Sequence, residues 1–187
     1  AQQSAKIPRI GFLTTSPSVF PVRIEAFRQG LREVGYVEGK NILIEWRYTE
    51  GKLDRGLALA AELVRLKVDI LVSSGPTLTN MLKEATPTIP IVMAYHTDPV
   101  GTGLVASLAR PGGNITGLSV LAPELGGKRL EILKEVVPKL SRVAVLGSST
   151  LPGNAETLRE TELAAGASGV KLQFLDVLSP EDIEPAF

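Results

Sequence analysis

The sequence predicts an α/β protein, built on a parallel sheet with helices on both of its faces. Four times along the chain, an apolar strand-like segment leads into a loop of small polar residues with Gly or Pro, and an amphipathic helical pattern follows. The strand ends and loops read FLTTSPSVFP, ILVSSGPTLTN, VMAYHTDPVGTG and VLGSSTLPGN. In such a sheet, ligands bind beyond the carboxyl ends of the strands, where these loops converge. The loops are rich in Ser, Thr and Gly and poor in bases, nucleophiles and metal ligands. This composition favours binding of a small molecule over catalysis of its reaction.

Hydrophobic periodicity indicates alternating strands and helices in the first 118 residues. We expect strands at 9–14, 41–48, 68–73, 89–94 and 115–120. We expect helices at 22–34, 53–66, 77–85 and 99–109. Gly35 suits the C-cap of the first of these helices, because glycine tolerates the left-handed conformation found there. The alternation of apolar and polar residues in 41–48 is typical of a strand near a sheet edge.

The pattern restarts near residues 118–121, so we expect two lobes, residues 1–118 and residues 119–187. The second lobe is expected to hold helices at 123–137 and 154–165 and strands at 142–146 and 170–177. Ser179 and Pro180, followed by two acidic residues, predict the start of another helix. The sequence stops about two turns into that helix, so we expect the second lobe to be incomplete here. An open sheet edge then favours self-association of this piece of chain.

Composition excludes several classes of function. Lys plus Arg and Asp plus Glu number 20 each among 187 residues, and no basic run occurs, which argues against a nucleic-acid partner. No apolar stretch approaches the roughly 20 residues of a membrane-spanning helix. Cys is absent and His96 is the only His, which excludes thiolate catalysis, a His triad and a sulfur- or His-rich metal site. We therefore expect no cofactor, no metal and no enzymatic activity.

The start of the chain bears on its location. It opens AQQSAKIPRI without Met. A short polar lead before the first strand is what remains when a signal peptide is cleaved at a small-residue site, although the boundary of an expressed segment looks the same. We expect an exported protein.

Two loops supply the first candidate ligand-binding residues. In the second loop Pro76 occupies the first helical position, so we expect the N–H groups of this helix N-terminus to bind a carboxylate or phosphate. Alternatively, Ser74 and Thr77 only cap the helix, and the hydroxyls after the first strand face the same choice. The candidates from these two loops are Thr14, Thr15, Ser16, Ser74, Gly75, Pro76 and Thr77.

The third loop offers residues with two interpretations each. Asp98 before Pro99 is a typical N-cap pair for the helix expected at 99–109. The functional alternative is a carboxylate that pairs with a ligand ammonium group, and both roles can hold at once. Tyr95 either packs under its loop or stacks on an aromatic ligand. His96 beside it suits a solvated or hydrogen-bonded structural residue.

Four runs of the sequence resemble one protein family. They are EAFRQGLREVGYVEGKN (25–41), ALAAELVRLKVDILV (58–72), IPIVMAYHTDPVGTGLVASLARPGGNITGLS (89–119) and GKRLEILKEVVPKLSRVAVL (127–146). They are similar to the ABC-transporter substrate-binding proteins that include tryptophan- and tyrosine-binding members, and DPVGTGLVASLARPGGNITG is specific enough to carry the resemblance alone. The resemblance implies a type I periplasmic binding fold, in which two doubly wound parallel-sheet lobes close on a ligand.

The resemblance also implies a function and a site. The protein would bind a small carboxylate-bearing ligand, an amino acid or an aromatic or branched-chain relative, in the periplasm after removal of a signal peptide, and deliver it to an ABC permease in the inner membrane. A ligand sensor of the same fold, a sugar or nucleoside binder and an α/β enzyme are the alternatives. The absence of arginine from the four loops argues for little charge on the ligand beyond one carboxylate. The family's contacting loops correspond to Thr14 to Ser16, Ser74 to Thr77, the Asp98 region, and Ser148, Ser149 and Asn154.

Overall fold

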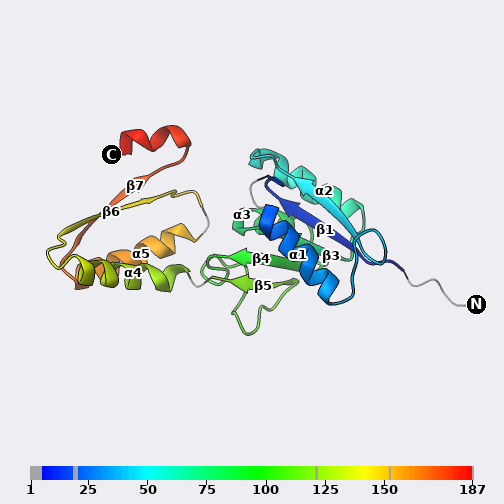
Figure 1. The fold of residues 1–187 in the computed structure, drawn as a ribbon, viewed down its shortest axis with the longest axis horizontal. Helices are drawn as coiled ribbons and strands as arrows, with labels where there is room; N and C mark the ends of the chain where they lie inside the picture. The colour runs from blue at the N-terminus through cyan, green and yellow to red at the C-terminus, as the bar shows by residue number, and fades with distance from the viewer. Residues whose placement is uncertain (1–5, 19–20, 121, 152, 187) are drawn as a thin grey trace, which may run out of the picture. The chain divides into compact units, whose positions relative to one another are not determined.

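The computed structural model describes residues 6–18, 21–120, 122–151 and 153–186. The first five residues of the polar lead, on which the expectation of export rests, lie outside the described part. The chain divides into two compact units (Figure 1). The first comprises Ala1–His96 and Val105–Leu118, and the second comprises Thr97–Leu104 and Ser119–Phe187. That these units are two lobes closing on a ligand stays a prediction.

The first unit is built on a five-stranded sheet. Its strands are β1 (Arg9–Thr14), β2 (Leu43–Tyr48), β3 (Ile70–Ser73), β4 (Ile91–His96) and β5 (Ile115–Ser119). They lie in the order β2-β1-β3-β4-β5. Strand β1 pairs in parallel with β2 and with β3, and β3 pairs in parallel with β4. The predicted parallel sheet is confirmed, and so is the edge position of the strand predicted at 41–48.

Helices cover both faces of this sheet (Figure 1). They are α1 (Pro21–Glu33), α2 (Gly56–Arg65) and α3 (Pro76–Ala85), with a short 3-10 turn, η1 (Leu53–Arg55), before α2. Helix α1 packs Phe27 and Leu31 against a cluster around Phe12. Neighbouring residues of a strand point to opposite faces, and a Cβ added at Gly11 would lie 3.1 Å from Leu63 Cδ2 of α2. Helices α1 and α2 therefore cover opposite faces of β1.

The core of the first unit lies where α2 and α3 meet the central strands. Its largest fully buried aliphatic side chains come from β1, β3, β4 and these two helices. They are Leu13, Leu63, Leu71, Leu82 and Ile91, with no exposed surface. Packing of this kind favours the fold by roughly 1.5–3 kcal/mol per buried aliphatic side chain.

Residues 99–109, predicted as a helix, form a series of turns and bends instead. The N–H of Gly103 bonds the Val100 carbonyl at 2.9 Å, and the N–H of Leu104 bonds the Pro99 carbonyl at 3.0 Å. Gly103 has φ 67°, a left-handed conformation that ends helical geometry. Each glycine in a helix also costs about 1 kcal/mol relative to alanine. The helix prediction was wrong because the capping signal at its start was followed by two glycines.

The second unit packs two helices on a two-stranded parallel sheet. Its elements are α4 (Ala122–Val136), β6 (Arg142–Gly147), α5 (Asn154–Ala167), β7 (Lys171–Asp176) and the 3-10 turns η2 (Pro180–Asp182) and η3 (Glu184–Ala186). Leu130 of α4 and Ala165 of α5 form its core with Val170. Ser179 makes the predicted N-cap, as part of a capping box with Asp182, but the turn it starts is 3-10 rather than α-helical. None of the helices within the described residues is long and apolar enough to span a membrane.

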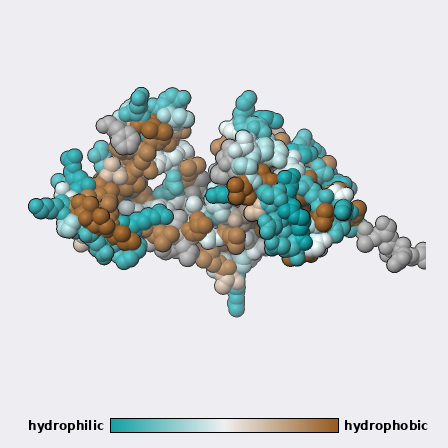
Figure 2. All heavy atoms as spheres, in the orientation of Figure 1, coloured by the Kyte–Doolittle hydropathy of each residue, from teal (hydrophilic) through white to brown (hydrophobic). Residues whose placement is uncertain are grey.

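The second unit leaves much apolar surface exposed (Figure 2). Along α4, the side chains of Leu125, Ile132, Leu133 and Val136 are between 40% and 74% exposed. On the sheet, Leu146 is also exposed, at 48%. Exposed apolar surface of this kind favours association, but the expected self-association stays a prediction.

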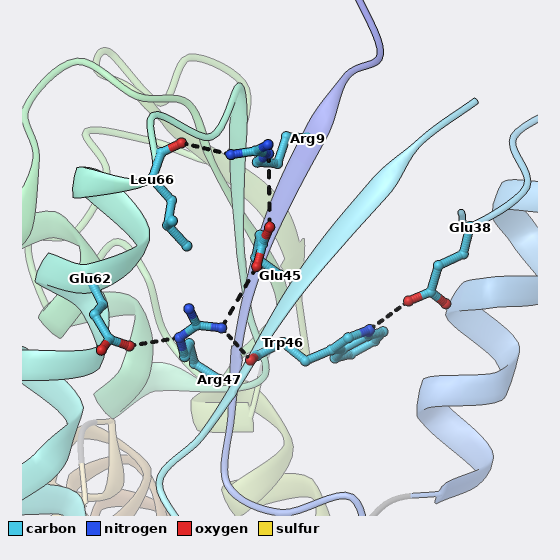
Figure 3. A network of polar contacts seen from close by, with 7 residues as sticks. All are labelled: Arg9, Glu38, Glu45, Trp46, Arg47, Glu62 and Leu66. Atoms are coloured by element: carbon cyan, nitrogen blue, oxygen red, sulfur yellow. Dashed lines mark hydrogen bonds and ion pairs between the residues drawn. The ribbon is translucent and has the colours of Figure 1, made fainter. Parts of the chain in front are cut away.

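A chain of polar contacts ties the edge strand β2 to its neighbours (Figure 3). Glu45 lies 3.8 Å from the guanidinium groups of both Arg9 of β1 and Arg47 of β2. Arg47 Nε in turn donates to Glu62 of α2 at 2.7 Å. Arg9 Nη1 donates to the Leu66 carbonyl at the end of α2, at 3.2 Å. Single exposed ion pairs contribute little to stability, whereas this half-buried series joins three elements and fixes the position of α2 over the sheet.

Trp46 occupies the face of β2 opposite to Glu45 and Arg47. Its ring stacks on Phe12 with centroids 4.7 Å apart, and the Arg28 guanidinium lies 5.1 Å from its centroid. The indole N–H donates to Glu38 at 2.9 Å (Figure 3). Partial burial acts to raise the pKa of Glu38, but hydrogen bonds from Trp46 and Arg28 and the charge of Arg28 outweigh it and hold that pKa below its ordinary value.

Candidate ligand-binding site

Hydroxyl groups link the carboxyl ends of β1 and β3 in the first unit. Ser74 Oγ donates to Thr14 Oγ1 at 2.8 Å, and the Ser74 N–H donates to the Leu13 carbonyl at 3.2 Å. Thr14 is almost fully buried. Ser16, also buried, lies with its hydroxyl 2.9 Å from that of Ser18. Thr14 and Ser74 are thus bonded to each other at the strand ends, and Ser16 bonds Ser18 in the loop that follows β1; we call the hydroxyls of Thr14, Ser16 and Ser74 the hydroxyl rim.

Two further hydroxyls lie where this rim meets β2. Within the part of the chain that is described, the buried Oγ1 atoms of Thr15 and Thr49 have no hydrogen-bond partner. The backbone places them together, because the N–H of Thr49 bonds the Thr14 carbonyl and the N–H of Glu50 bonds the Thr15 carbonyl. A buried hydroxyl without a partner costs about 1–3 kcal/mol. Thr49 was missed by the sequence reasoning, although a Thr directly after an edge strand is a usable signal.

The N-terminus of α3 confirms the predicted position of Pro76 but not a cap by Ser74. Pro76 is at the first helical position and Gly75 is the N-cap residue, with no side chain capping this end. Ser74 does not cap the helix, because its hydroxyl bonds Thr14 instead. Thr79 Oγ1 donates to the Gly75 carbonyl at 2.8 Å and lies 2.6 Å from Ser73 Oγ. The N-terminus of α3 is therefore held by the contacts of Thr79 with Gly75 and Ser73. A ligand role for Gly75, Pro76 and Thr77 stays a prediction.

Tyr95 at the end of β4 packs against two parts of its own unit. A Cβ added at Gly75 would lie 3.2 Å from Tyr95 Oη, so glycine lets the loop approach the ring. The Arg23 guanidinium carbon lies 5.4 Å from the ring centroid. Packing of Tyr95 against its neighbours is thus seen, while stacking on a ligand stays a prediction. Arg23 was missed because it follows the first loop by two residues and lies in the first turn of α1.

His96, the next residue of β4, is fully buried. Burial excludes the solvated alternative for His96, whereas the alternative of a hydrogen-bonded structural residue stays a prediction. The reason for this burial is its place as the last residue of an internal strand, with β3 on one side and β5 on the other. No group of three or more His, Cys, Asp or Glu side chains suited to a metal ion occurs among the described residues.

Asp98, which belongs to the second unit, caps a turn. Its Oδ1 accepts from the Gly101 N–H at 2.7 Å, and its carbonyl accepts from Thr102 Oγ1 at 2.6 Å. Gly153, at the N-cap of α5, has φ 85° and lies against this segment: a Cβ there would overlap Thr97 Oγ1 and lie 3.6 Å from Asp98 Cβ. The capping role predicted for Asp98 is seen on a turn rather than on a helix.

We expect Asp98→Asn to leave both stability and ligand affinity nearly unchanged, because asparagine caps about as well as aspartate. Asp98→Ala is the matched variant and should lower the free energy of unfolding by about 1 kcal/mol. Urea unfolding and calorimetric titration of both variants measure the two quantities. If Asp98→Asn keeps its stability but binds ligand more weakly by about 1.5 kcal/mol or more, the carboxylate pairs with a ligand ammonium group instead.

The three remaining candidates are Ser148 and Ser149, which directly follow β6, and Asn154, the first residue of α5. Asn154 Nδ2 donates to the Ser148 carbonyl at 2.8 Å. Ser149 donates to Asp176 of β7 through both its N–H, at 2.8 Å, and its hydroxyl, at 2.6 Å. Asp176 was not singled out in the sequence. These contacts hold the loop between β6 and α5, so the side-chain groups of Ser149 and Asn154 already have partners in the unit.

Comparison with known proteins places this fold in a family. Residues 16–187 match the family model described as ABC transporter substrate binding protein. The tyrosine-binding protein of Clostridioides difficile strain R20291 is 33% identical over 146 residues, which make up 76% of this chain and 41% of that protein. The relatives that match by sequence are thus binding proteins rather than enzymes.

Solved structures agree with this match. A conserved domain protein from Vibrio cholerae is 29% identical with a TM-score of 0.87, and the match covers 97% of this chain and 61% of that one. An ABC domain from Streptococcus pneumoniae in complex with L-Trp is 27% identical with a TM-score of 0.85, and the match covers 96% and 60% of the two chains. The 187 residues span less than two-thirds of the length of these relatives. The fold is that of the type I periplasmic binding proteins, and the chain belongs to the ABC transporter substrate-binding protein family.

Proposed function

We propose that the protein is the solute-binding component of an ABC importer and that its ligand is a small molecule with a carboxylate. Among such molecules, we propose an aromatic amino acid. The relatives support this choice, since one is named for tyrosine binding and another was solved with L-Trp. Its proposed location is the periplasm, after export, where it hands the ligand to a permease in the inner membrane.

The observation that carries the proposal is the rim of hydroxyl groups at the strand ends of the first unit. The Ser74 and Thr14 hydroxyls bond each other at the ends of β3 and β1, and the Thr15 hydroxyl beside them is buried. Hydroxyls and backbone N–H groups hold a polar ligand by hydrogen bonds without reacting with it. A site of this kind fits a binding protein better than an enzyme.

Calorimetric titration of the whole protein tests the proposal. We expect saturable binding of L-tryptophan or L-tyrosine without chemical change of the ligand. The melting temperature should rise in their presence, because a ligand at 100 times its Kd stabilises the native state by about 2.7 kcal/mol. L-Leucine, ribose and adenosine complete the panel. If only ribose or adenosine binds, the sugar or nucleoside alternative replaces the proposal. Steady turnover of any of these compounds would instead make the protein an enzyme.

A further inference from the structure

Arg23 brings a positive charge to the same edge of the first unit as the hydroxyl rim. It lies in the first turn of α1, which follows the loop after β1. Its guanidinium lies 5.4 Å from the ring centroid of Tyr95, the penultimate residue of β4. Tyr95 Oη in turn approaches Gly75, the N-cap residue of α3. The charge is thus held at the carboxyl ends of the strands rather than on the outer surface of the helices.

This position is electrostatically unusual for an arginine. The N-terminus of a helix carries a partial positive charge, so a cation in the first turn is disfavoured and an acidic residue is preferred there. Neither α1 nor α3 has an acidic residue in its first turn, although both begin at this edge. Two positive helix ends and one guanidinium therefore act in the same direction, and an anion is the ligand that they would stabilise.

The contact with Tyr95 also prepares Arg23 for recognition. A cation–π contact uses the face of the guanidinium and of the ring, and it is compatible with a forked pair of N–H bonds to a carboxylate. The ring also restricts the rotamers of a long side chain, which lowers the entropy lost on binding.

We infer that Arg23 is the residue that selects the carboxylate of the ligand, and that Tyr95 positions it. This inference rests on the proposed function. Arginine is absent from the four loops, as the sequence argument stated, but Arg23 reaches their edge from α1.

The test compares L-tryptophan with L-tryptophanamide, which lacks the carboxylate, by calorimetric titration of the whole protein. Wild-type protein should bind the acid more tightly than the amide. Arg23→Gln should weaken binding of L-tryptophan at least tenfold and binding of the amide less than twofold. The affinity of Arg23→Lys for L-tryptophan should lie between those of wild type and Arg23→Gln. Tyr95→Leu should weaken binding of the acid more than of the amide, whereas Tyr95→Phe keeps the ring and should stay close to wild type. Arg32→Gln is the matched control, because Arg32 lies on the same helix and pairs with Glu25 at 2.7 Å.

The outcomes separate the inference from the proposed function. If Arg23→Gln keeps wild-type affinity for L-tryptophan, or loses the same factor for the acid and the amide, the inference is overturned while the proposed function stands. If the wild-type protein binds none of L-tryptophan, L-tyrosine and L-leucine, both the inference and the proposed function are overturned. Because Arg23 is exposed, the melting temperature of Arg23→Gln without ligand should match that of wild type, and a clear drop would overturn the recognition role in favour of a structural one.

Discussion

Leu71→Ala will destabilise the first unit by about 3 kcal/mol, within the 2–5 kcal/mol range measured for buried leucines. Leu71 has no exposed surface and lies on β3, the middle strand of the sheet. Its Cδ2 sits where a Cβ on Gly11 of β1 would be only 2.9 Å away, so it packs directly on the neighbouring backbone. Alanine would leave a cavity there, because a β-strand backbone cannot move in to fill it.

Urea unfolding followed by fluorescence measures this loss, since Trp46 is the only Trp of the chain and packs in the same unit. Ile70→Ala is the matched control. Ile70 precedes Leu71 on the same strand but is 38% exposed, so its loss should cost less than about 1 kcal/mol. Equal costs for the two variants would contradict the placement of the core on the Leu71 face of β3.

Gly117→Ala will also be strongly destabilising, by about 3 kcal/mol, through strain and overlap together. Gly117 of β5 has φ 145°, a conformation that residues with a side chain rarely adopt. A Cβ at this position would overlap the carbonyl oxygen of Met93 on β4 and lie 2.8 Å from the Met93 nitrogen. Backbone cannot rotate away as a flexible side chain can, so β5 must separate from β4.

Gly113→Ala is the control for Gly117→Ala. No atom lies within 4 Å of a Cβ built at Gly113, and its φ is outside the left-handed region. We expect its melting temperature to stay within a few degrees of wild type, against a drop of roughly 8–15 °C for Gly117→Ala. If Gly117→Ala keeps the melting temperature of wild type, β5 does not lie as close to β4 as in the structure.

Local patterns in the sequence were sufficient for most of the secondary structure. The apolar and polar alternation of 41–48 predicted the edge strand, and Gly35 ends α1 with φ 88° as its C-cap position required. Signals of this kind act over a few residues, so they can be read without knowing the rest of the fold. The helix predicted at 99–109 failed for the same reason, because Asp98 and Pro99 start a turn that Gly101 and Gly103 then stop.

The candidate site shows the limit of local signals. The sequence correctly selected loops of small polar residues at strand ends, since those loops follow directly from the strand and helix pattern. It could not give the partners of their side chains. Ser74 bonds Thr14 across 60 residues of chain, and Ser149 bonds Asp176 across 27.

The type of most elements, the parallel sheet and the family were determined by the sequence, because periodicity, caps and motifs depend on residues that are close together along the chain. The order β2-β1-β3-β4-β5, the burial of His96 and the meeting of Arg23 with Tyr95 were decided by the tertiary structure. These features depend on which strands lie next to each other. Strand order is set by the packing of the whole unit, and only that packing brings a cation from the first turn of α1 to the end of β4.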